Sequence, residues 1–241
     1  MTFPVHQAVL LTGASVGIGR EMALQLAHWR GRGARIALAA RDAAKLEEVA
    51  ALCRAAGAEA VVLPTDVGIE SDCERAVAHT VAAFGGLDTL LLNAGQDMGV
   101  RLDELQDASV LERIMRVNYL GPAWLTRFAL PHLKNRRGRI IVVSSLAGLT
   151  GVPTRSGYAA SKHALHGFFD SLRIELAGTG VSVTLACPDF VKSEIHRRAL
   201  GADGQAVGQS PLREERIMTA ADCAALILGA GAARRRMVLL S

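Results

Sequence analysis

Two ionisable side chains stand four residues apart in the segment Tyr158-Ala-Ala-Ser-Lys162. On a helix, this spacing places both side chains on one face. A nearby ammonium favours the charged form of a phenol, so we expect Lys162 to lower the pKa of Tyr158 from its usual value of about 10. A tyrosine tuned in this way can give a proton to a carbonyl oxygen or take one from an alcohol. The chain has one other tyrosine, Tyr119, so the choice of residue has little competition.

A glycine-rich segment follows the first apolar run of the chain. Residues 12–19 read Thr-Gly-Ala-Ser-Val-Gly-Ile-Gly and open a helical pattern. Glycines allow positive φ and let a pyrophosphate approach bare backbone, while the N-terminus of the following helix offers unpaired N–H groups. A turn in this place, between a strand and a helix, predicts a dinucleotide-binding site. The residues expected to contact the dinucleotide there are Gly13, Ser15, Val16, Gly17, Ile18 and Gly19.

Short apolar runs alternate with longer helical patterns along the chain. The predicted strands are Val5–Leu11, Arg35–Ala40, Ala60–Pro64, Thr89–Leu92, Arg139–Ser144, Val181–Ala186 and Met237–Leu240. The predicted helices are Glu21–Arg30, Ala43–Ala56, Ser71–Phe84, Val110–Lys134, Tyr158–Ala177 and Ala220–Ala230, with Asp42 and Thr219 as N-caps. This alternation predicts an α/β fold, a single Rossmann-type domain over residues 1–241 with a doubly wound, seven-stranded parallel sheet and helices on both faces.

Composition excludes several classes of protein. With 241 residues, 50% of them hydrophobic, the chain is too apolar to be disordered. The net charge of +4 comes from scattered short clusters, and ten aromatic residues give nucleic-acid bases little to stack on, so we predict no nucleic-acid binding. No apolar run reaches the roughly 18–20 residues that span a bilayer, and the first one leads straight into the glycine-rich turn. We therefore expect a cytoplasmic protein without a membrane partner or a cleaved presequence.

The four cysteines show no paired spacing that would suggest a metal site. They are Cys53, Cys73, Cys187 and Cys223. We expect free thiols in a reducing compartment, and no bound metal.

The spacing Gly-x-x-x-Gly-x-Gly, led by Thr-Gly-Ala-Ser, resembles the short-chain dehydrogenase/reductase family, and further matches extend from Leu10 to about Ser193. The resemblance implies catalytic roles for Asn118, Ser145, Tyr158 and Lys162. Ser145, at the end of a predicted strand and thirteen residues before Tyr158, would steady the substrate oxygen, with Ser144 as second choice. Asn118 would hold a water that links Lys162 to solvent in a proton relay.

The cofactor that the resemblance implies is a nicotinamide dinucleotide, and we expect NADP(H) rather than NAD(H). An acid at the end of the second strand would bind an NAD ribose hydroxyl, but Ala40 occupies that position. Arg41 follows, and its guanidinium could grip a 2′-phosphate, which Ser15 could also contact. Val16 stands where some relatives that prefer NADP carry a second basic residue. The alternative interpretation makes Arg41 a solvated loop residue.

Further cofactor contacts follow from the resemblance at the ends of later strands. Asp66-Val67 resembles the pair beside the adenine, and Asn93-Ala94-Gly95 resembles the turn beside the adenosine ribose. After the sixth predicted strand, Pro188, Val191 and Ser193 match cofactor-contacting positions, and Tyr158 and Lys162 would also touch the cofactor. Asp189 replaces the glycine usual in the family. Aspartate tolerates unusual φ, so the change is either structurally neutral or brings a carboxylate that steers a polar or cationic substrate.

The stretch from Pro188 to Met218 has no clear strand or helix pattern, and we expect it to be the substrate lid. It mixes apolar residues with a basic group: Ile195, Leu200, Val207 and Leu212 with Lys192, His196, Arg197 and Arg198. This composition suits an apolar pocket with a basic rim, or a solvated lid with ordinary charges. Leu146, Leu149, Val152 and Pro153 would add apolar lining.

These features predict an oxidoreductase that transfers a hydride between NADP(H) and a small-molecule carbonyl compound or secondary alcohol. The alternatives are a 3-oxoacyl thioester reductase that docks an acidic acyl carrier, and a non-catalytic NADP-binding regulator. The family resemblance also implies a homodimer or homotetramer, assembled through the helices at 110–134 and 158–177.

Overall fold

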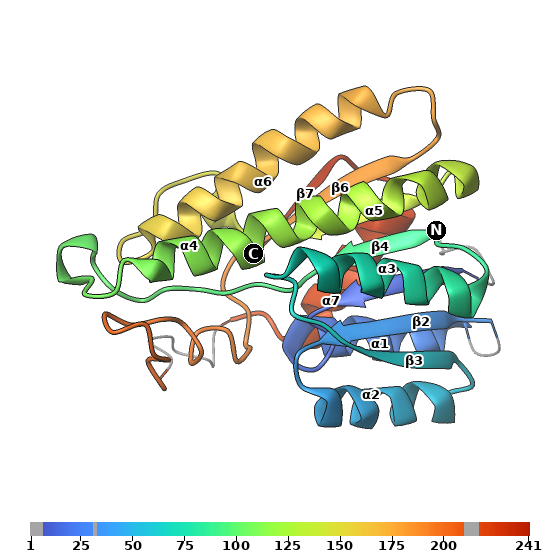
Figure 1. The fold of residues 1–241 in the computed structure, drawn as a ribbon, viewed down its shortest axis with the longest axis horizontal. Helices are drawn as coiled ribbons and strands as arrows, with labels where there is room; N and C mark the ends of the chain where they lie inside the picture. Colours follow the sequence, from blue (N-terminus) through green and yellow to red (C-terminus); the bar gives the residue numbers. More distant parts are fainter. Residues whose placement is uncertain (1–6, 31–32, 210–216) are drawn as a thin grey trace.

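The structure, a computed structural model, describes residues 7–30, 33–209 and 217–241. Seven parallel strands form one sheet in the order β3-β2-β1-β4-β5-β6-β7 (Figure 1). The strands are β1 (Ala8–Thr12), β2 (Arg35–Ala40), β3 (Glu59–Pro64), β4 (Thr89–Leu92), β5 (Arg139–Val143), β6 (Ser182–Pro188) and β7 (Met237–Leu240). The predicted fold class is confirmed, and six of the strands both begin and end within two residues of the prediction. The predicted start of the first strand, Val5 and His6, lies outside the described residues.

Helices cover both faces of the sheet (Figure 1). On one face lie α1 (Gly17–Arg30), α2 (Ala43–Ala55) and α7 (Ala220–Ala232), and on the other α3 (Glu70–Phe84), α5 (Gly121–Arg136) and α6 (Ser156–Glu175). Successive residues of a strand point to opposite faces, so Val9 and Leu11 of β1 enter one core while Ala8 and Leu10 enter the other. A strand buried on both sides must be apolar throughout, which explains the continuous runs in the sequence.

The two predicted helix caps are confirmed. The Asp42 carboxylate accepts a hydrogen bond from the backbone N of Lys45 at 3.1 Å, and the Thr219 hydroxyl accepts one from the N of Asp222 at 3.1 Å. Each bond satisfies a backbone donor that the first turn of a helix leaves free.

The predicted helix over Val110–Lys134 is present, but it contains a π-helical turn that the sequence pattern did not indicate. The chain forms α4 (Ser109–Met115), a π-helical turn η2 (Arg116–Leu120) and then α5. Two contacts hold the chain at this π turn. The Asn118 side chain is bonded to the backbone of Gln96, and Gly121 lies so close to the segment after β3 that a Cβ there would be 2.5 Å from the carbonyl oxygen of Val67. A π turn is a frequent feature of functional sites because it redirects the helix backbone.

The segment after β6 lies at the carboxyl-end edge of the sheet, beside the loop that follows β4 (Figure 1). Met98 and Leu200 form an isolated parallel bridge, and the N of Gly99 donates to the O of Leu200 at 2.9 Å. Two short 3₁₀ turns, η1 (Leu102–Glu104) and η3 (Leu146–Gly148), lie in neighbouring loops. Residues 210–216, with Leu212 of the expected lid, lie outside the described residues. Within the described ranges, no helix has the length and apolar character that crossing a bilayer requires.

Candidate active site

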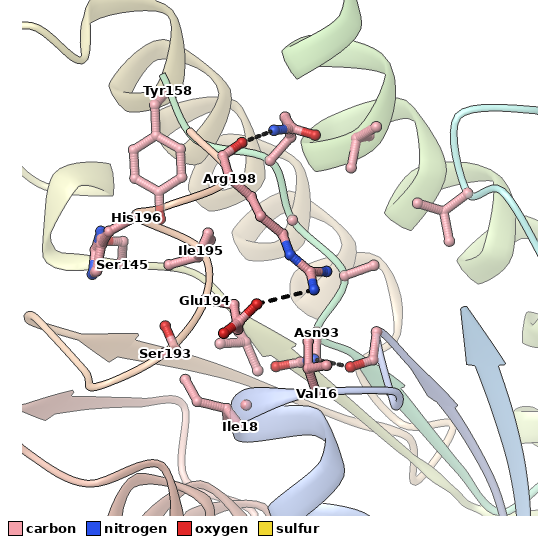
Figure 2. Close-up of a pocket in the computed structure, with 18 of the residues that line it drawn as sticks. Val16, Ile18, Asn93, Ser145, Tyr158, Ser193, Glu194, Ile195, His196 and Arg198 are labelled. Carbon is pink, nitrogen blue, oxygen red and sulfur yellow. Dashed lines mark hydrogen bonds and ion pairs between the residues drawn. The ribbon is translucent and has the colours of Figure 1, made fainter. Parts of the chain in front are cut away.

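A cleft of about 1140 Å³ crosses the carboxyl ends of strands β1 to β6. Ligands bind at this edge in open α/β sheets. Of the expected catalytic and cofactor-binding residues, all line this cleft except Gly19 and Asn118. Of the expected apolar lining, Leu146 and Val152 line it, but Leu149 and Pro153 do not. In the close-up, Val16, Ile18 and Asn93 lie toward one end of the cleft, and Ser145 and Tyr158 toward the other (Figure 2).

The glycine-rich turn connects β1 to α1 with two residues of positive φ. Gly13 has φ +65° and Gly17 has φ +55°, values that residues with a Cβ rarely adopt. A Cβ on Gly19 would lie 2.1 Å from the carbonyl oxygen of Gly13. Gly19 thus lets α1 fold tightly over the turn, and its position is behind the cleft, not in its wall.

The end of β2 presents a cation to the cleft. Arg41 is exposed there, and among the described residues no carboxylate pairs with its guanidinium. The neighbouring Asp42 is occupied as the helix cap, and the backbone N–H of Lys45 that it accepts lowers the pKa of its carboxyl. Lys45 also lines the cleft. This corner therefore has basic side chains and lacks the strand-end acid that would repel a phosphate.

The ends of β3 and β4 supply the cleft floor. Asp66 accepts a hydrogen bond from the N of Gly68 at 2.9 Å, which fixes its carboxylate in an Asx-type turn. The Asn93 amide donates to the carbonyl oxygens of Thr12 and Gly13, at 3.1 and 3.2 Å. Asn93 therefore holds the glycine-rich turn in place as well as lining the cleft.

Ser145, Tyr158 and Lys162 come together from β5 and α6. The Nζ of Lys162 lies 5.6 Å from the centre of the Tyr158 ring and donates to the carbonyl oxygen of Val143 at 3.0 Å. The side chain of Ser145 is close enough to Tyr158 to lower the pKa of the phenol, while its Oγ donates to the O of Pro188 at 3.4 Å and accepts from the N of Ala147 at 3.2 Å. Tyr158 is 7% exposed and Lys162 is 3% exposed, so both functional groups are almost dehydrated.

The predicted direction of the Tyr158 pKa is wrong for the protein on its own. Burial, the largest cause, raises the pKa of Tyr158 above its usual range, and the Asp97 carboxylate raises it further. The Ser145 side chain and the Arg155 charge act in the opposite direction. Burial also lowers the pKa of Lys162 to about 8. A dehydrated site favours the neutral form of both groups, and this outweighs the attraction that the spacing alone suggested.

Asn118 lies on the π turn, behind the cleft wall. Its Nδ2 donates to the O of Gln96 and to the Oγ of Ser161, both at 2.9 Å, and its Oδ1 accepts from the N of Gln96 at 2.7 Å. Its amide hydrogens are thus used within the protein. The side chain fixes the loop after β4 against α6 at Ser161, the residue directly before Lys162.

The residues after β6 form the far wall of the cleft. The N of Asp189 donates to the O of Leu240 at 2.7 Å, and Asp189 is not among the described non-glycine residues with positive φ. Glycine is therefore not needed here, and the substitution puts an exposed carboxyl at the cleft. Val191 bridges to Met218, while Ser193 lies against the glycine-rich turn, its Cβ 3.4 Å from where a Cβ on Gly17 would be.

Sequence reasoning missed an ionic cluster beside Tyr158. Asp97 and Arg155 form an ion pair at 2.6 Å, with side chains 1% and 12% exposed, and His196 lies next to both. Arg155 stands three residues before Tyr158 at the start of α6, and Asp97 shortly follows the Asn93-Ala94-Gly95 turn. No sequence spacing links residues 58 positions apart, so only the fold brings this pair together.

Comparison with known proteins agrees with this architecture. The short chain dehydrogenase family model matches residues 7–202. 11-beta-Hydroxysteroid dehydrogenase A of Sesamum indicum is 38% identical over 88% of this chain and 60% of its own length. For 11-beta-hydroxysteroid dehydrogenase-like 4A of Arabidopsis thaliana, identity is 38% over 92% of this chain and 72% of that protein. The chain thus spans only part of the length of these relatives, about three fifths of the first and just under three quarters of the second.

A solved structure has the same fold over nearly the whole chain. It is an alcohol dehydrogenase from the archaeon Thermococcus sibiricus complexed with 5-hydroxy-NADP, with a TM-score of 0.83, 24% identity, and coverage of 97% of this chain and 95% of that one. The family match covers most of the chain, and the geometry of the cleft is consistent with it. The chain belongs to the short-chain dehydrogenase family.

Proposed function

We propose that this protein catalyses reversible hydride transfer between NADP(H) and a carbonyl compound or the corresponding secondary alcohol. The observation that carries the proposal is the meeting of Ser145, Tyr158 and Lys162 at one end of a cleft whose other end is the glycine-rich turn. When bound, the nicotinamide supplies or accepts the hydride. The protein supplies position, a proton and an environment without water.

In the reductive direction, Tyr158 gives its proton to the oxygen that becomes the alcohol, while Ser145 hydrogen-bonds the same oxygen. Burial keeps the Tyr158 phenol protonated, which suits a group that must arrive as an acid. Lys162 would hold the nicotinamide ribose and pass protons toward solvent. The amide hydrogens of Asn118 are already bonded to Gln96 and Ser161. Asn118 would therefore support that relay indirectly, by fixing the π turn beside Lys162.

For the cofactor, we propose NADP(H) over NAD(H). The residues fit the dinucleotide because Gly13 and Gly17 leave the turn without side chains. Arg41 gives the β2 corner a positive charge where a 2′-phosphate would lie, and Ala40 contributes no acid. Lys45 also lines this corner but pairs with Asp42 at 3.5 Å. The NADP analogue named in the archaeal structure agrees with this preference.

The proposed substrates are apolar carbonyl compounds, with residues 188–218 as the lid of a single unit over 1–241. Leu146, Val152 and Leu200 line the cleft near Tyr158. The names of the plant relatives add hydroxysteroids to the candidates. The acyl-carrier alternative has less support, because the cleft arginines Arg113, Arg116 and Arg198 already pair with the chain's own carboxylates. We further propose a homodimer or homotetramer formed through α5 and α6.

The test is a substrate screen that follows absorbance at 340 nm. Aldehydes, aliphatic and aromatic ketones, acetoacetyl thioesters and an 11-oxosteroid are each offered with NADPH and with NADH. We expect turnover of at least one ketone or aldehyde, faster with NADPH. Turnover confined to the thioesters would favour the acyl reductase, and tight NADPH binding without any turnover would favour the regulator.

A further inference from the structure

The ionic cluster beside Tyr158 contains a buried hydrogen-bonding atom that the protein does not use. Asp97 Oδ2 lies 2.6 Å from Arg155 Nη1 and 3.6 Å from His196 Nδ1. Arg155 Nη2 lies 3.4 Å from the same His196 nitrogen. The other ring nitrogen of His196, Nε2, is buried and has no hydrogen-bond partner among the described residues.

These distances favour one form of the imidazole. The contact with Arg155 is within hydrogen-bond range and a guanidinium only donates, so Nδ1 is the acceptor and the proton resides on Nε2. The carboxylate of Asp97 is already held by Arg155 at 2.6 Å and, through its Oδ1, by the N of Met98 at 2.8 Å. His196 is thus a fixed donor whose N–H has nothing to bind.

His196 belongs to the wall of the catalytic cleft. It lines the cleft together with Arg155, Phe190 and Tyr158. Figure 2 draws it on the lid segment near Ser145 and Tyr158. The Phe190 ring packs edge-on against the His196 ring, at 5.8 Å between centres, and lies 5.4 Å from the Arg155 guanidinium carbon. The imidazole is therefore braced on two sides by groups that do not use Nε2.

We infer that His196 Nε2–H is a specificity-determining donor that binds a second oxygen of the substrate, apart from the oxygen that reacts. This inference rests on the proposed function and narrows its substrate class to carbonyl compounds or alcohols with another oxygen acceptor close to the reacting carbon. His196 lines the cleft, so the cleft is the side from which a partner for Nε2 can come. A site with a buried donor discriminates strongly against a substrate that leaves the donor unpaired.

The experiment compares two ketones that differ by one oxygen. Benzil is a 1,2-diketone, and deoxybenzoin is the same skeleton with one carbonyl replaced by CH₂. The value of kcat/KM for each is measured with saturating NADPH in the wild type, His196→Leu and His196→Gln. The control is His163→Leu, which changes an exposed histidine of α6 outside the cleft.

We expect the benzil to deoxybenzoin ratio to fall about tenfold in His196→Leu, the loss of one hydrogen bond. His196→Gln, which keeps an N–H donor, should recover part of the ratio, and His163→Leu should leave the ratio at the wild-type value. An unchanged ratio in His196→Leu, or an equal loss on both ketones, would overturn the inference.

A second readout does not depend on turnover. Side-chain ¹⁵N spectra of the NADP⁺ complex, assigned with His196→Gln, report the protonation of each imidazole nitrogen. We expect His196 as the neutral form with the proton on Nε2, and a shift of that N–H on addition of benzil but not of deoxybenzoin. A proton on Nδ1, or equal responses to both compounds, would contradict the assignment. If no carbonyl compound were reduced, the proposed function would fail, while these spectra would still decide the role of His196.

Discussion

The two ends of the cleft are built in different ways. The cofactor end is made of backbone: the turn at residues 12–19 and the ends of β2 and β4, where Gly13 and Gly19 have no room for a side chain. The substrate end is made of side chains from distant segments, above all the buried pair Asp97–Arg155 with His196. Glycines leave bare backbone, and such a surface suits a cofactor that many enzymes share. Buried side chains such as the Asp97–Arg155 pair can differ from one protein to another, and such differences can suit the cleft to one substrate.

This difference makes separate demands on the two ends. A change at Arg41, an exposed side chain of the cofactor end, alters affinity for the dinucleotide, because the glycine-rich turn is held by Asn93 and not by Arg41. A change at the substrate end alters stability as well, because a buried charge that loses its partner is costly. The following substitutions test this separation, beginning with the largest expected effect.

Tyr158→Phe should separate chemistry from cofactor binding. Loss of the acid–base group should lower kcat by about 10²–10⁴-fold, while the Kd for NADPH, measured by fluorescence titration, stays within about threefold. The matched control is Tyr119→Phe, because the ring of Tyr119 packs edge-on against Phe168. Wild-type turnover in Tyr158→Phe would disprove the proton-transfer role.

Asp97→Asn should damage the substrate end alone. The amide can still accept from the N of Met98, but Arg155 loses its buried partner, so the free energy of unfolding should fall by about 3–5 kcal/mol. Because the Asp97 carboxylate raises the pKa of Tyr158, its removal should also move the alkaline limb of the pH–rate profile to lower pH. Denaturant unfolding and the pH profile measure the two effects.

The control for this charge is Asp103→Asn. Asp103 pairs with Arg101 at the surface, both side chains more than 60% exposed, and such pairs contribute at most about 1 kcal/mol. Equal destabilisation by the two substitutions would show that the buried pair has no special weight. A large loss of NADPH affinity in Asp97→Asn would show that the two ends are not separable.

Lys162→Met should stabilise the protein while removing activity. Burial lowers the pKa of Lys162 to about 8 from a usual 10.5, so the folded state binds fewer protons than the unfolded chain between these values. Wild-type stability should therefore rise with pH from about 8 toward 10, and the penalty of the buried charge is fully present below pH 8. At pH 7 the variant should be more stable by up to about 3 kcal/mol. Thermal melts from pH 7 to 9.5 test this, and a less stable variant would contradict it.

Arg41→Ala should change cofactor preference and little else. Removing a charged contact to the 2′-phosphate should lower kcat/KM for NADPH about 10–100-fold and leave the value for NADH within about twofold. Raising the ionic strength should reduce the difference between the wild type and the variant, because Arg41 is exposed. Equal losses with both cofactors would assign Arg41 a structural role.

Much of the fold could be predicted because its signals are local. Apolar runs marked β2, β4 and β7 at their observed bounds, and Asp42 and Thr219 marked helix starts through a side chain that reaches three residues ahead. The π turn at Asn118 could not be predicted in this way. It depends on Gln96, which lies in the loop after β4. The backbone N and O of Gln96 both hydrogen-bond to the side-chain amide of Asn118.

The candidate site divides along the same line. Neighbouring residues alone marked the glycine-rich turn, Arg41 at the end of β2, and the Tyr158–Lys162 pair on one helix face, since each depends on a spacing of a few residues. Tertiary structure decided the direction of the Tyr158 pKa, because burial depends on what the rest of the chain places around the phenol. It also decided that Asp97, Arg155 and His196 meet beside the reacting groups, since three segments far apart in sequence become neighbours only when the sheet aligns their ends.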